Sequence, residues 1–257
     1  MRLFLALAPL ALTACPERTL PERGVMLVYK KPDDTSVRAT VDRRLAHLKL
    51  RAKLQEDPSR LTVRVSNSAE LPRIKALLSL EGRLSFCPED DPTAAAWCDR
   101  AWPAPLSVDR GEQRCTVQGP SREAISSELA DAGVTLAFGT RAPLVLGYAL
   151  DAAGCRSPHL VDAEVQEAGG QAALKLEFDK SSARDFAELT TKCVGHRMLI
   201  TLDGEVQSAP VVMSPITGGR AMITVGPGED VGVLGAALVG GPLPKLTLEK
   251  EGPYGPP

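Results

Sequence analysis

The sequence is poor in the residues from which most nucleic-acid, metal and catalytic sites are built. Aromatic residues make up 4% of its 257 positions, too few for base-stacking platforms or aromatic ligand cages. Three histidines in total leave little material for a metal centre or a catalytic triad. The net charge is -2 and no long basic block exists, so we expect no nucleic-acid partner and no cofactor.

Long hydrophobic runs are also scarce after the first residues. The most apolar late stretch, Val231–Leu243, is rich in glycine and is interrupted by Pro242. It falls far short of the roughly 20 residues that a membrane-spanning helix needs. We therefore expect the mature chain to be a domain outside the bilayer.

The N-terminus does carry a short apolar run, Leu3–Leu12, which follows a basic residue and precedes Thr13-Ala14-Cys15. This arrangement is typical of a signal peptide, here residues 1–14. The letters LTAC resemble the bacterial lipobox, in which the cysteine becomes acylated, so we predict lipidation of Cys15 and a polar tether over residues 15–24. Several acyl chains on one residue give durable membrane attachment. The alternative is an ordinary signal peptide with a chance cysteine.

Five cysteines follow Cys15, and an exported protein meets an oxidising compartment in which disulfides form. An odd number leaves at least one thiol over. The spacings do not form CxxC pairs and no histidine lies nearby, so we expect no zinc site. We predict two bridges, of open connectivity, with Cys193 reduced on a helix. The bridged cysteines lie in or beside the central segment and are Cys87, Cys98, Cys115 and Cys155.

The apolar pattern of residues 25–87 predicts a β-α-β-α-β unit. The helix over Ser36–Leu54 carries an apolar stripe, and Arg43 and Arg44 fall off it, which is typical of a solvated helix face. Pro72 suits the first turn of the second helix. The expected strands are Val25–Tyr29, Leu61–Val65 and residues 83–87.

Residues 88–120 break this pattern, because they are rich in proline and acidic side chains and predict a loop-rich insertion. A helix over Ser121–Ala132 and a strand over Leu144–Leu150 follow. From about Pro158 the alternation resumes as β-α-β-β-β-α-β, which indicates an α+β fold with a largely antiparallel sheet. The expected elements there are strands Ala172–Phe178, Arg197–Leu202, Glu205–Val212, Ala221–Val225 and Leu246–Leu248, and helices Ser181–Cys193 and Glu229–Val239.

Asp203-Gly204 between two alternating apolar runs is a strong signal for a β-hairpin. Pro210 cannot donate a ladder hydrogen bond, so the strand Glu205–Val212 is expected at a sheet edge or with a bulge. Ser208 then lies within a strand, without the sharp strand-to-helix turn of a nucleophilic serine, and we expect no catalytic role for it.

Other catalytic or metal interpretations are weaker still. Cys193 and His196 lack a third orienting group, so a thiol–imidazole pair is not expected. His159 beside Asp162 is typical of a turn histidine. The acidic run Glu89-Asp90-Asp91 lacks the spacing of a calcium loop and predicts a solvated loop. We expect the protein not to be an enzyme.

The C-terminal third resembles the periplasmic P1 domain of the SecD/SecDF protein-export family. The matching features are a Phe-x-x-Leu-Thr helix, a following glycine, the Asp-Gly turn, a Ser-Ala-Pro triplet, a Gly-Gly pair and a Leu-Pro end. They are Phe186, Leu189, Thr190, Gly195, Asp203, Gly204, Ser208, Ala209, Pro210, Gly218, Gly219, Leu243 and Pro244. The stretch TVDRRLAHL, at residues 40–48, more faintly resembles an arginine-rich helix of the same family.

The resemblance implies a base of two ferredoxin-like α+β halves, residues 25–87 and 158–250, with a small disulfide-containing head inserted at residues 88–157. Residues 251–257 would form a tail. In this family the region handles the translocating chain and has no enzymatic site. Because family energy coupling depends on charged residues in membrane helices, proton-driven pulling is not carried over to this chain.

The resemblance therefore implies a non-catalytic module on the periplasmic side of a bacterial envelope. Its partners would be Sec translocase components or unfolded exported polypeptides, contacted through residues 88–157 and the edge strand Glu205–Val212. Pro16 is not the aspartate associated with inner-membrane retention, which favours the outer membrane by analogy. The alternative is an envelope scaffold that reuses the fold without a role in translocation.

Overall fold

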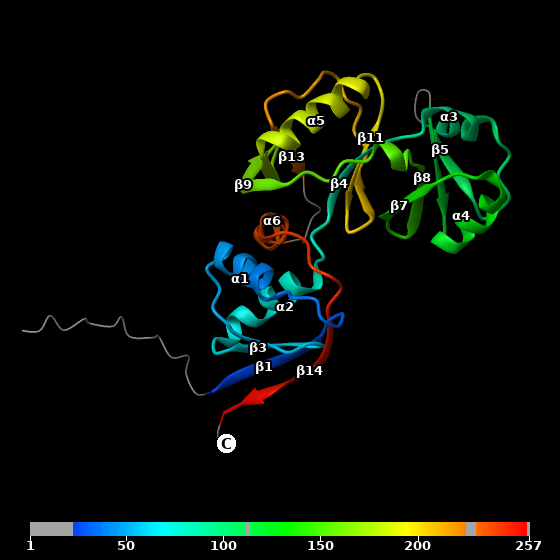
Figure 1. Cartoon of the computed structure of the whole chain (residues 1–257). Helices are drawn as coiled ribbons and strands as arrows, with labels where there is room; N and C mark the ends of the chain where they lie inside the picture. The colour runs from blue at the N-terminus through cyan, green and yellow to red at the C-terminus, as the bar shows by residue number, and fades with distance from the viewer. Residues whose placement is uncertain (1–22, 111–113, 225–229, 256–257) are drawn as a thin grey trace, which may run out of the picture.

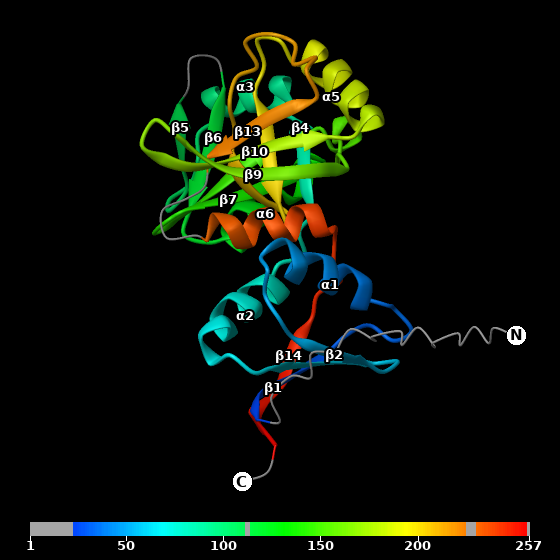
Figure 2. The same cartoon turned by 90° about the vertical axis from the view of Figure 1, so that its left-hand side faces the viewer.

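The computed structural model describes residues 23–110, 114–224 and 230–255, except the side chain of Asp131. The predicted signal peptide and the predicted lipidation site, Cys15, lie outside the described residues. Three sheets and the helices between them form an elongated arrangement, with the N-terminal sheet at one end and α5 and the inserted segment at the other (Figures 1 and 2).

Sheet 1 has four antiparallel strands in the order β14-β1-β3-β2. Alternate residues of its strands, such as Leu27 and Val63, are buried beneath the helices on one face (Figure 2). Its elements are β1 (Gly24–Lys30), β2 (Lys53–Glu56), β3 (Arg60–Val65), β14 (Thr247–Tyr254), α1 (Arg38–His47) and α2 (Leu71–Ser79).

Helix α1 is shorter than the pattern predicts. It ends at His47 because Lys49 takes a left-handed conformation, φ 56°, and two backbone bonds close the helix end. Lys49 N–H donates to Ala46 O at 3.0 Å, and Leu50 N–H donates to Leu45 O at 2.9 Å. This Schellman ending usually carries glycine at the left-handed position, so a lysine there gives no sequence signal.

Sheet 2 has the order β13-β10-β9 and packs against α5 (Lys180–Lys192). Its strands are β9 (Leu160–Ala168), β10 (Gln171–Phe178) and β13 (Arg220–Thr224), of which β9 was not expected. Helix α6 (Val231–Gly240) lies between sheet 2 and the helices of sheet 1 (Figure 1).

Helix α6 is apolar on every side, as a helix buried between two layers should be. The predicted stripe Val231, Leu234 and Leu238 packs into the core of sheet 2. The opposite side, with Val233 and Ala236, packs into the core of sheet 1. The helix therefore joins the two cores.

Sheet 3 has seven strands in the order β4-β11-β12-β7-β8-β6-β5. It combines β4 (Leu84–Pro88), β11 (Met198–Leu202) and β12 (Glu205–Ser208) with four strands of the inserted segment. These four are β5 (Ser107–Arg110), β6 (Cys115–Gly119), β7 (Leu136–Arg141) and β8 (Leu144–Ala149).

The inserted segment is more ordered than the expected loop-rich insertion. Helix α3 (Asp91–Asp99) begins where Asp90 caps Thr93 N–H and Pro92 occupies the first turn. Helix α4 (Arg122–Glu128) begins at the expected cap, Ser121. A separate core forms beneath them; its buried members are Ala94, Trp97, Leu106, Cys115, Val117, Ile125, Leu129 and Ala149. Short 3₁₀ turns cover residues 68–70, 130–132 and 152–154.

The expected α+β class with largely antiparallel sheets is confirmed, since only β12 and β7 pair in parallel within the described strands. One grouping differs. Strand β14 pairs with β1 and runs to Tyr254, so it belongs to the sheet of the N-terminal half and extends into the expected tail.

Arg44 was expected on a solvated face, but it is fully buried. Its guanidinium donates five hydrogen bonds to four carbonyl oxygens at the ends of α2 and α6. The acceptors are Leu77 O (3.0 Å), Leu80 O (2.6 Å), Glu81 O (2.7 Å) and Gly241 O (2.8 and 3.2 Å). Burial lowers the pKa of Arg44 to about 10, and the charge of Asp203 opposes this effect.

Replacing Arg44 with methionine should strongly destabilise the fold, because the four carbonyl groups lose their buried donor. Each buried group left unsatisfied costs about 1–3 kcal/mol, so we expect a loss of about 3 kcal/mol or more in urea unfolding. Arg43→Met is the matched control: exposed Arg43 makes two hydrogen bonds, to Gly240 O and Thr40 Oγ1, and its loss should cost about 1 kcal/mol or less because water can replace it. Equal losses in the two variants would contradict the role of Arg44.

Candidate interaction site

The Asp203-Gly204 hairpin forms as predicted. Leu202 and Glu205 are paired across it, and φ is 51° at Asp203 and 83° at Gly204, as a type I′ turn requires. The Asp203 carboxylate also accepts the backbone N–H groups of Glu81 (2.9 Å) and Arg83 (2.7 Å). The turn thus fixes the chain that crosses from α2 to β4.

The Leu243-Pro244 end of the motif set meets the same crossing segment. Leu243 is buried and its N–H donates to Glu81 O at 2.8 Å, the oxygen that Arg44 also contacts. Pro244 is half-buried. These motif residues therefore have structural contacts that hold the crossing segment in place.

Gly204→Val should destabilise the chain by about 1–3 kcal/mol, because a β-branched residue is strained at positive φ. Nothing lies within 4 Å of a Cβ at this position, so the cost arises from the backbone alone. Gly204→Asn is the control, since asparagine tolerates positive φ. The measurement is thermal unfolding, and a valine variant as stable as the asparagine variant would refute the strained turn.

A second motif group surrounds α5. Phe186 and Leu189 are buried in the core of sheet 2. Thr190 is fully buried, and its hydroxyl donates to Phe186 O (2.9 Å) and accepts Ile216 N–H (2.9 Å). The threonine therefore attaches the segment 211–219 to the helix.

The Gly218-Gly219 pair lets this segment pass close to α5. A Cβ on Gly219 would lie 2.9 Å from the Ala183 side chain, and φ at Gly219 is 65°. Gly219 O accepts the Phe178 N–H at 2.9 Å, which leads the chain into β13. Gly218 is exposed, with open space around it.

The segment held in this way presents apolar side chains to solvent. Met213 is 84% exposed, Val211 is 45% exposed and Val194 is 41% exposed. Val194 pairs with Val212, and Gly195 N–H donates to Val212 O at 2.8 Å, so Val194 lies beside this segment. We call Val194, Pro210, Val211 and Met213 the apolar ridge.

Strand β12 is not at a sheet edge, but it does carry an irregularity of the expected kind, because its register with β11 shifts between Ile200 and Thr201. It lies between β11 and β7, and Arg122 of α4 forms an ion pair with Glu205. The named strand ends at Ser208, before Pro210, so the proline breaks no ladder bond. Ser208 and Ala209 are half-buried, and Pro210 O accepts the Met198 N–H at 2.9 Å.

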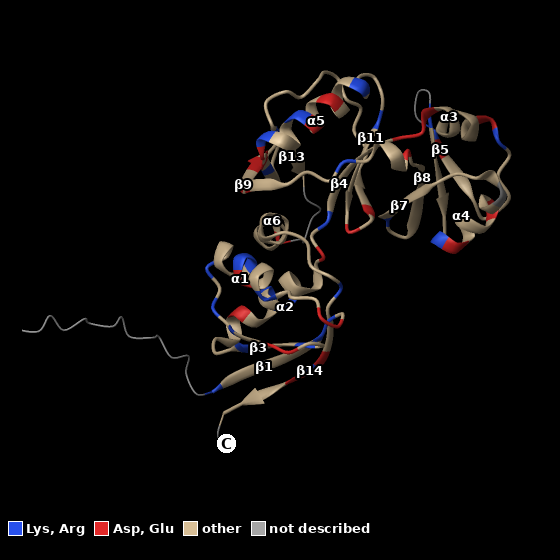
Figure 3. Ribbon diagram, viewed as in Figure 1, with Lys and Arg blue, Asp and Glu red and all other residues tan. Residues whose placement is uncertain are grey.

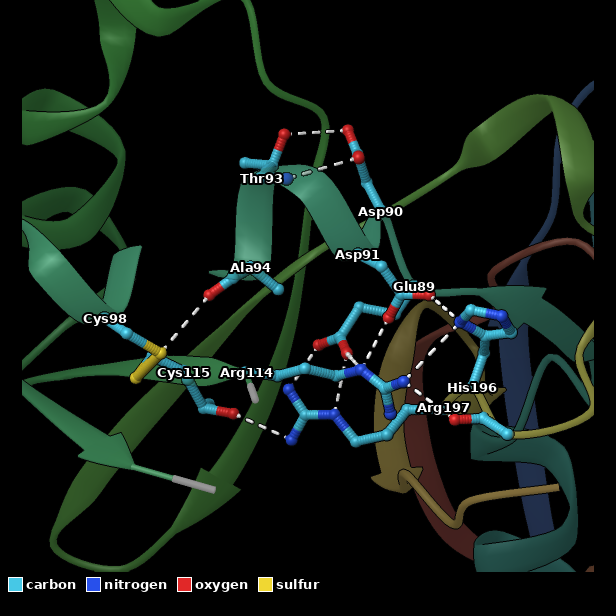
Figure 4. Close-up of polar contacts among 12 residues, drawn as sticks. Glu89, Asp90, Asp91, Thr93, Ala94, Cys98, Arg114, Cys115, His196 and Arg197 are labelled. Atoms are coloured by element: carbon cyan, nitrogen blue, oxygen red, sulfur yellow. Dashed lines mark hydrogen bonds and ion pairs between the residues drawn. A yellow bond between two sulfur atoms is a disulfide. The ribbon is translucent and has the colours of Figure 1, made fainter. Parts of the chain in front are cut away.

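A buried ion pair joins the inserted segment to β11 (Figure 4). Glu89 has no exposed side-chain surface, although the sequence predicts a solvated acidic loop there. Arg197 donates its Nε–H to Glu89 Oε2 at 2.7 Å, makes a second contact through Nη2, and donates Nη1–H to Thr116 Oγ1 at 3.2 Å. Burial raises the pKa of Glu89, and the hydrogen bonds and charge of Arg197 oppose that rise.

Asp91, Arg114 and His196 lie beside this pair (Figure 4), and among these three the His196 side chain is the most exposed. Arg114 Nε lies 2.6 Å from Asp91 Oδ1, and its Nη2–H donates to Gly195 O at 2.8 Å. His196 contacts Asp91 through Nδ1. Its partner is therefore a carboxylate, and the geometry gives no support to a thiol–imidazole pair.

Two disulfides fix the inserted segment. Cys87 is bonded to Cys155 and closes its two ends, and Cys98 is bonded to Cys115 and joins α3 to β6. Cys193 is reduced and buried, and burial raises the pKa of its thiol. A thiol of that kind is a poor nucleophile at neutral pH.

Arg197→Met should cost about 3–5 kcal/mol, because it removes both hydrogen bonds to the buried Glu89 carboxylate and leaves only Arg114 Nε, 4.0 Å away, as a cation beside it. Arg141→Met removes an exposed ion pair with Asp109 and should cost about 1 kcal/mol or less. The pair Glu89→Gln with Arg197→Met should restore part of the loss, since the fully buried carboxylate is then replaced by a neutral amide. Urea unfolding measures all three, and a loss for Arg197→Met no larger than for Arg141→Met would contradict the buried pair.

An apolar hollow beside α6 has a volume of about 380 Å³ and is lined by Leu84, Leu160 and Leu238 among others. His159 and Pro158 stand at its side. Among the described residues no cluster of His, Cys, Asp and Glu could hold a metal ion. No helix in the described parts of the chain is long and apolar enough to cross a membrane.

Comparisons with known proteins show which family this chain is similar to. Residues 141–245 match the family model described as SecDF, P1 head subdomain. The chain is 40% identical over 89 residues to the protein translocase subunit SecD of Acidaminococcus fermentans, covering 34% of this chain and 21% of that protein. It is 36% identical over 114 residues to SecD of Endomicrobium trichonymphae, covering 42% and 24%. The chain thus spans about a fifth to a quarter of the length of these relatives.

Solved structures share the fold over most of the chain. The crystal structure of SecDF in a super-membrane-facing form superposes with a TM-score of 0.59 at 19% identity, covering 92% of this chain and 32% of that one. A second SecDF structure, of a membrane component that enhances protein export, gives 0.54 at 20% identity, covering 89% and 98%.

These findings define the class first, an α+β domain with the fold seen in SecDF structures. The chain contains a SecD P1-like domain. The matched head model spans residues 141–245 and so includes much of the segment that the resemblance assigned to the base. The division into base and head at residues 88 and 157 stays a prediction.

Proposed function

We propose that this protein is a non-catalytic, lipid-anchored module of protein export that binds unfolded exported chains or translocon components. The observation that carries the proposal is the SecD-like segment, whose motif residues fix the backbone that exposes the apolar ridge to solvent. Exposed apolar side chains on a fixed backbone suit transient contact with an unfolded polypeptide, which is itself rich in exposed apolar groups.

Two neighbouring features support binding at the ridge. The segment that carries it leads into β13, an edge strand of sheet 2 with one unpaired side. An unpaired edge can accept an extended peptide by strand addition. Ser208, just before the ridge, and Thr224 of β13 line the same small pocket, so the two features are close together.

Site-specific photocrosslinking in living cells tests this proposal. A crosslinking amino acid at Gln207 or Met213, both exposed, should capture exported chains or Sec components. Ala96 is the matching exposed position on α3, because Trp97 itself is buried. Ala76, exposed on α2, is the control and should give no such products. Equal yields of crosslinked products at Ala76 and Met213 would contradict the proposed site.

The lipid anchor is a separate prediction. Cys15→Ser should release the protein from the membrane into the periplasmic fraction, because acylation needs the cysteine thiol. Cys193→Ser is the control and should remain with the membrane. Mass spectrometry that found unmodified Cys15 in the wild-type protein would contradict the anchor, and the density of the membrane fraction would test the predicted outer-membrane location.

An envelope scaffold that reuses this fold is the second candidate function. The inserted segment, with its own core and two disulfides, favours it because a rigid unit of this kind can hold a folded partner. Crosslinks from Ala96 to one folded envelope protein, with none to exported chains, would favour the scaffold.

A further inference from the structure

Sheet 1 has a second face that no described helix covers (Figures 1 and 2). Side chains alternate along its strands, so the residues between the buried ones point to this outer face. Basic side chains dominate it and occur in all four strands. They are Lys30, Lys53, Arg60, Arg64 and Lys250.

The charges of this outer face are poorly balanced. Arg60 has a carboxylate partner, Glu249, at 2.9 Å. Among the described residues no carboxylate lies within ion-pair distance of the other four cations, although acidic residues are common elsewhere on the chain (Figure 3). Because the whole protein has a net charge of -2, the basic face is a local feature.

The strand register places like charges directly opposite one another. Lys53 is paired with Arg64, and Lys30 is paired with Arg60. Such cross-strand pairs are unfavourable for the isolated sheet, so the sequence keeps them at a cost in stability. An anionic partner would relieve this repulsion.

We infer that the outer face of sheet 1 binds the anionic headgroups of a lipid membrane. The cations extend from β2 to β14, a distance of about 14 Å at the usual strand spacing. A surface of that width can contact several lipid headgroups in one plane, whereas a single small anion would contact only part of it. Half-buried Met26 and Val28 lie between them, which gives the face an apolar centre. Basic side chains around partly exposed apolar groups are typical of surfaces that lie on anionic bilayers.

The place of the tether supports the lipid surface as the occupant. Gly24, at the start of β1, follows Cys15 by nine residues in the sequence. A chain of that length reaches at most about 32 Å, so an acylated Cys15 would hold sheet 1 near the bilayer. The nearness of sheet 1 to the bilayer rests on the lipid anchor of the proposed function, whereas the support from the charge pattern does not depend on that anchor.

Vesicle partitioning tests the inference on the chain from Pro16 onward, which keeps every described residue and removes both the apolar run and Cys15. It should sediment with vesicles that contain about 30 mol% phosphatidylglycerol, weakly or not at all with pure phosphatidylcholine, and less as salt rises from about 0.05 to 0.5 M. Absence of binding to the anionic vesicles at low salt would overturn the inference. So would equal binding to the neutral vesicles.

A matched pair of triple variants locates the surface. Lys30→Gln, Arg64→Gln and Lys250→Gln together should weaken partitioning about 100-fold, since each cation contributes about fivefold. The control changes Lys180, Arg184 and Lys192 of α5 to glutamine, with the same change in net charge, and should bind as the parent does. Equal loss in the two triples would overturn the assignment to sheet 1.

The stability of the first triple variant gives an independent reading. Its melting temperature should be unchanged or higher, because the substitutions remove a like-charge pair on each of two rows, so weaker binding would not reflect unfolding. Acylation of Cys15 in cells is measured separately by mass spectrometry. An unacylated Cys15 with intact vesicle binding would refute the anchor and leave this inference standing.

Discussion

The fold depends above all on one buried guanidinium. Arg44 reaches from α1 to the carbonyl ends of α2 and α6, two helices that are far apart in the sequence. Helix C-termini expose carbonyl oxygens with no partner inside the helix, and a cation there satisfies them and their dipoles together. Glycines make the space: a Cβ on Gly240 would lie 2.3 Å from Arg44 Cγ. Asp203 and Leu243 both contact the backbone of Glu81 in the same region. The motif residues of the C-terminal third therefore bind the segment that Arg44 of α1 also holds.

The inserted segment is attached by a different kind of interaction. Arg44 binds only neutral carbonyls, whereas Arg197 is paired with the buried carboxylate of Glu89. Buried ion pairs contribute little net stability compared with apolar contacts, but they penalise any arrangement that separates the charges. Together with the Cys87–Cys155 bond and the β12–β7 contact, this pair fixes the direction in which the inserted segment leaves the rest of the chain.

The sequence predicts those parts of the fold that local signals determine. The Asp203-Gly204 turn, the Ser121 cap, the first turn at Pro72 and the α6 stripe are all short-range patterns, and each forms as expected. The failures have long-range causes. Arg44 cannot be recognised as buried without the carbonyls of α6, some 197 positions away. Strand β12 looks like an edge until β7 of the inserted segment lies beside it, and the end of α1 depends on a lysine where glycine would give the signal. Glu89 was missed because its partner lies 108 positions along the chain.

The two proposed surfaces lie on opposite sides of the α6 layer, and this separation bears on how the module would work. The apolar ridge belongs to the α5 side, and the basic face belongs to the outer side of sheet 1 (Figures 1 and 3). Helix α6 packs into both cores, so the two surfaces are held in a fixed relation by apolar contacts rather than by a linker. If sheet 1 rests on a bilayer, the ridge points away from it, toward chains that have already left the membrane. Such a module would be a rigid spacer that binds the bilayer through sheet 1 and a polypeptide through the apolar ridge. It needs no energy input to hold the polypeptide briefly, because the small number of exposed apolar side chains limits the binding free energy.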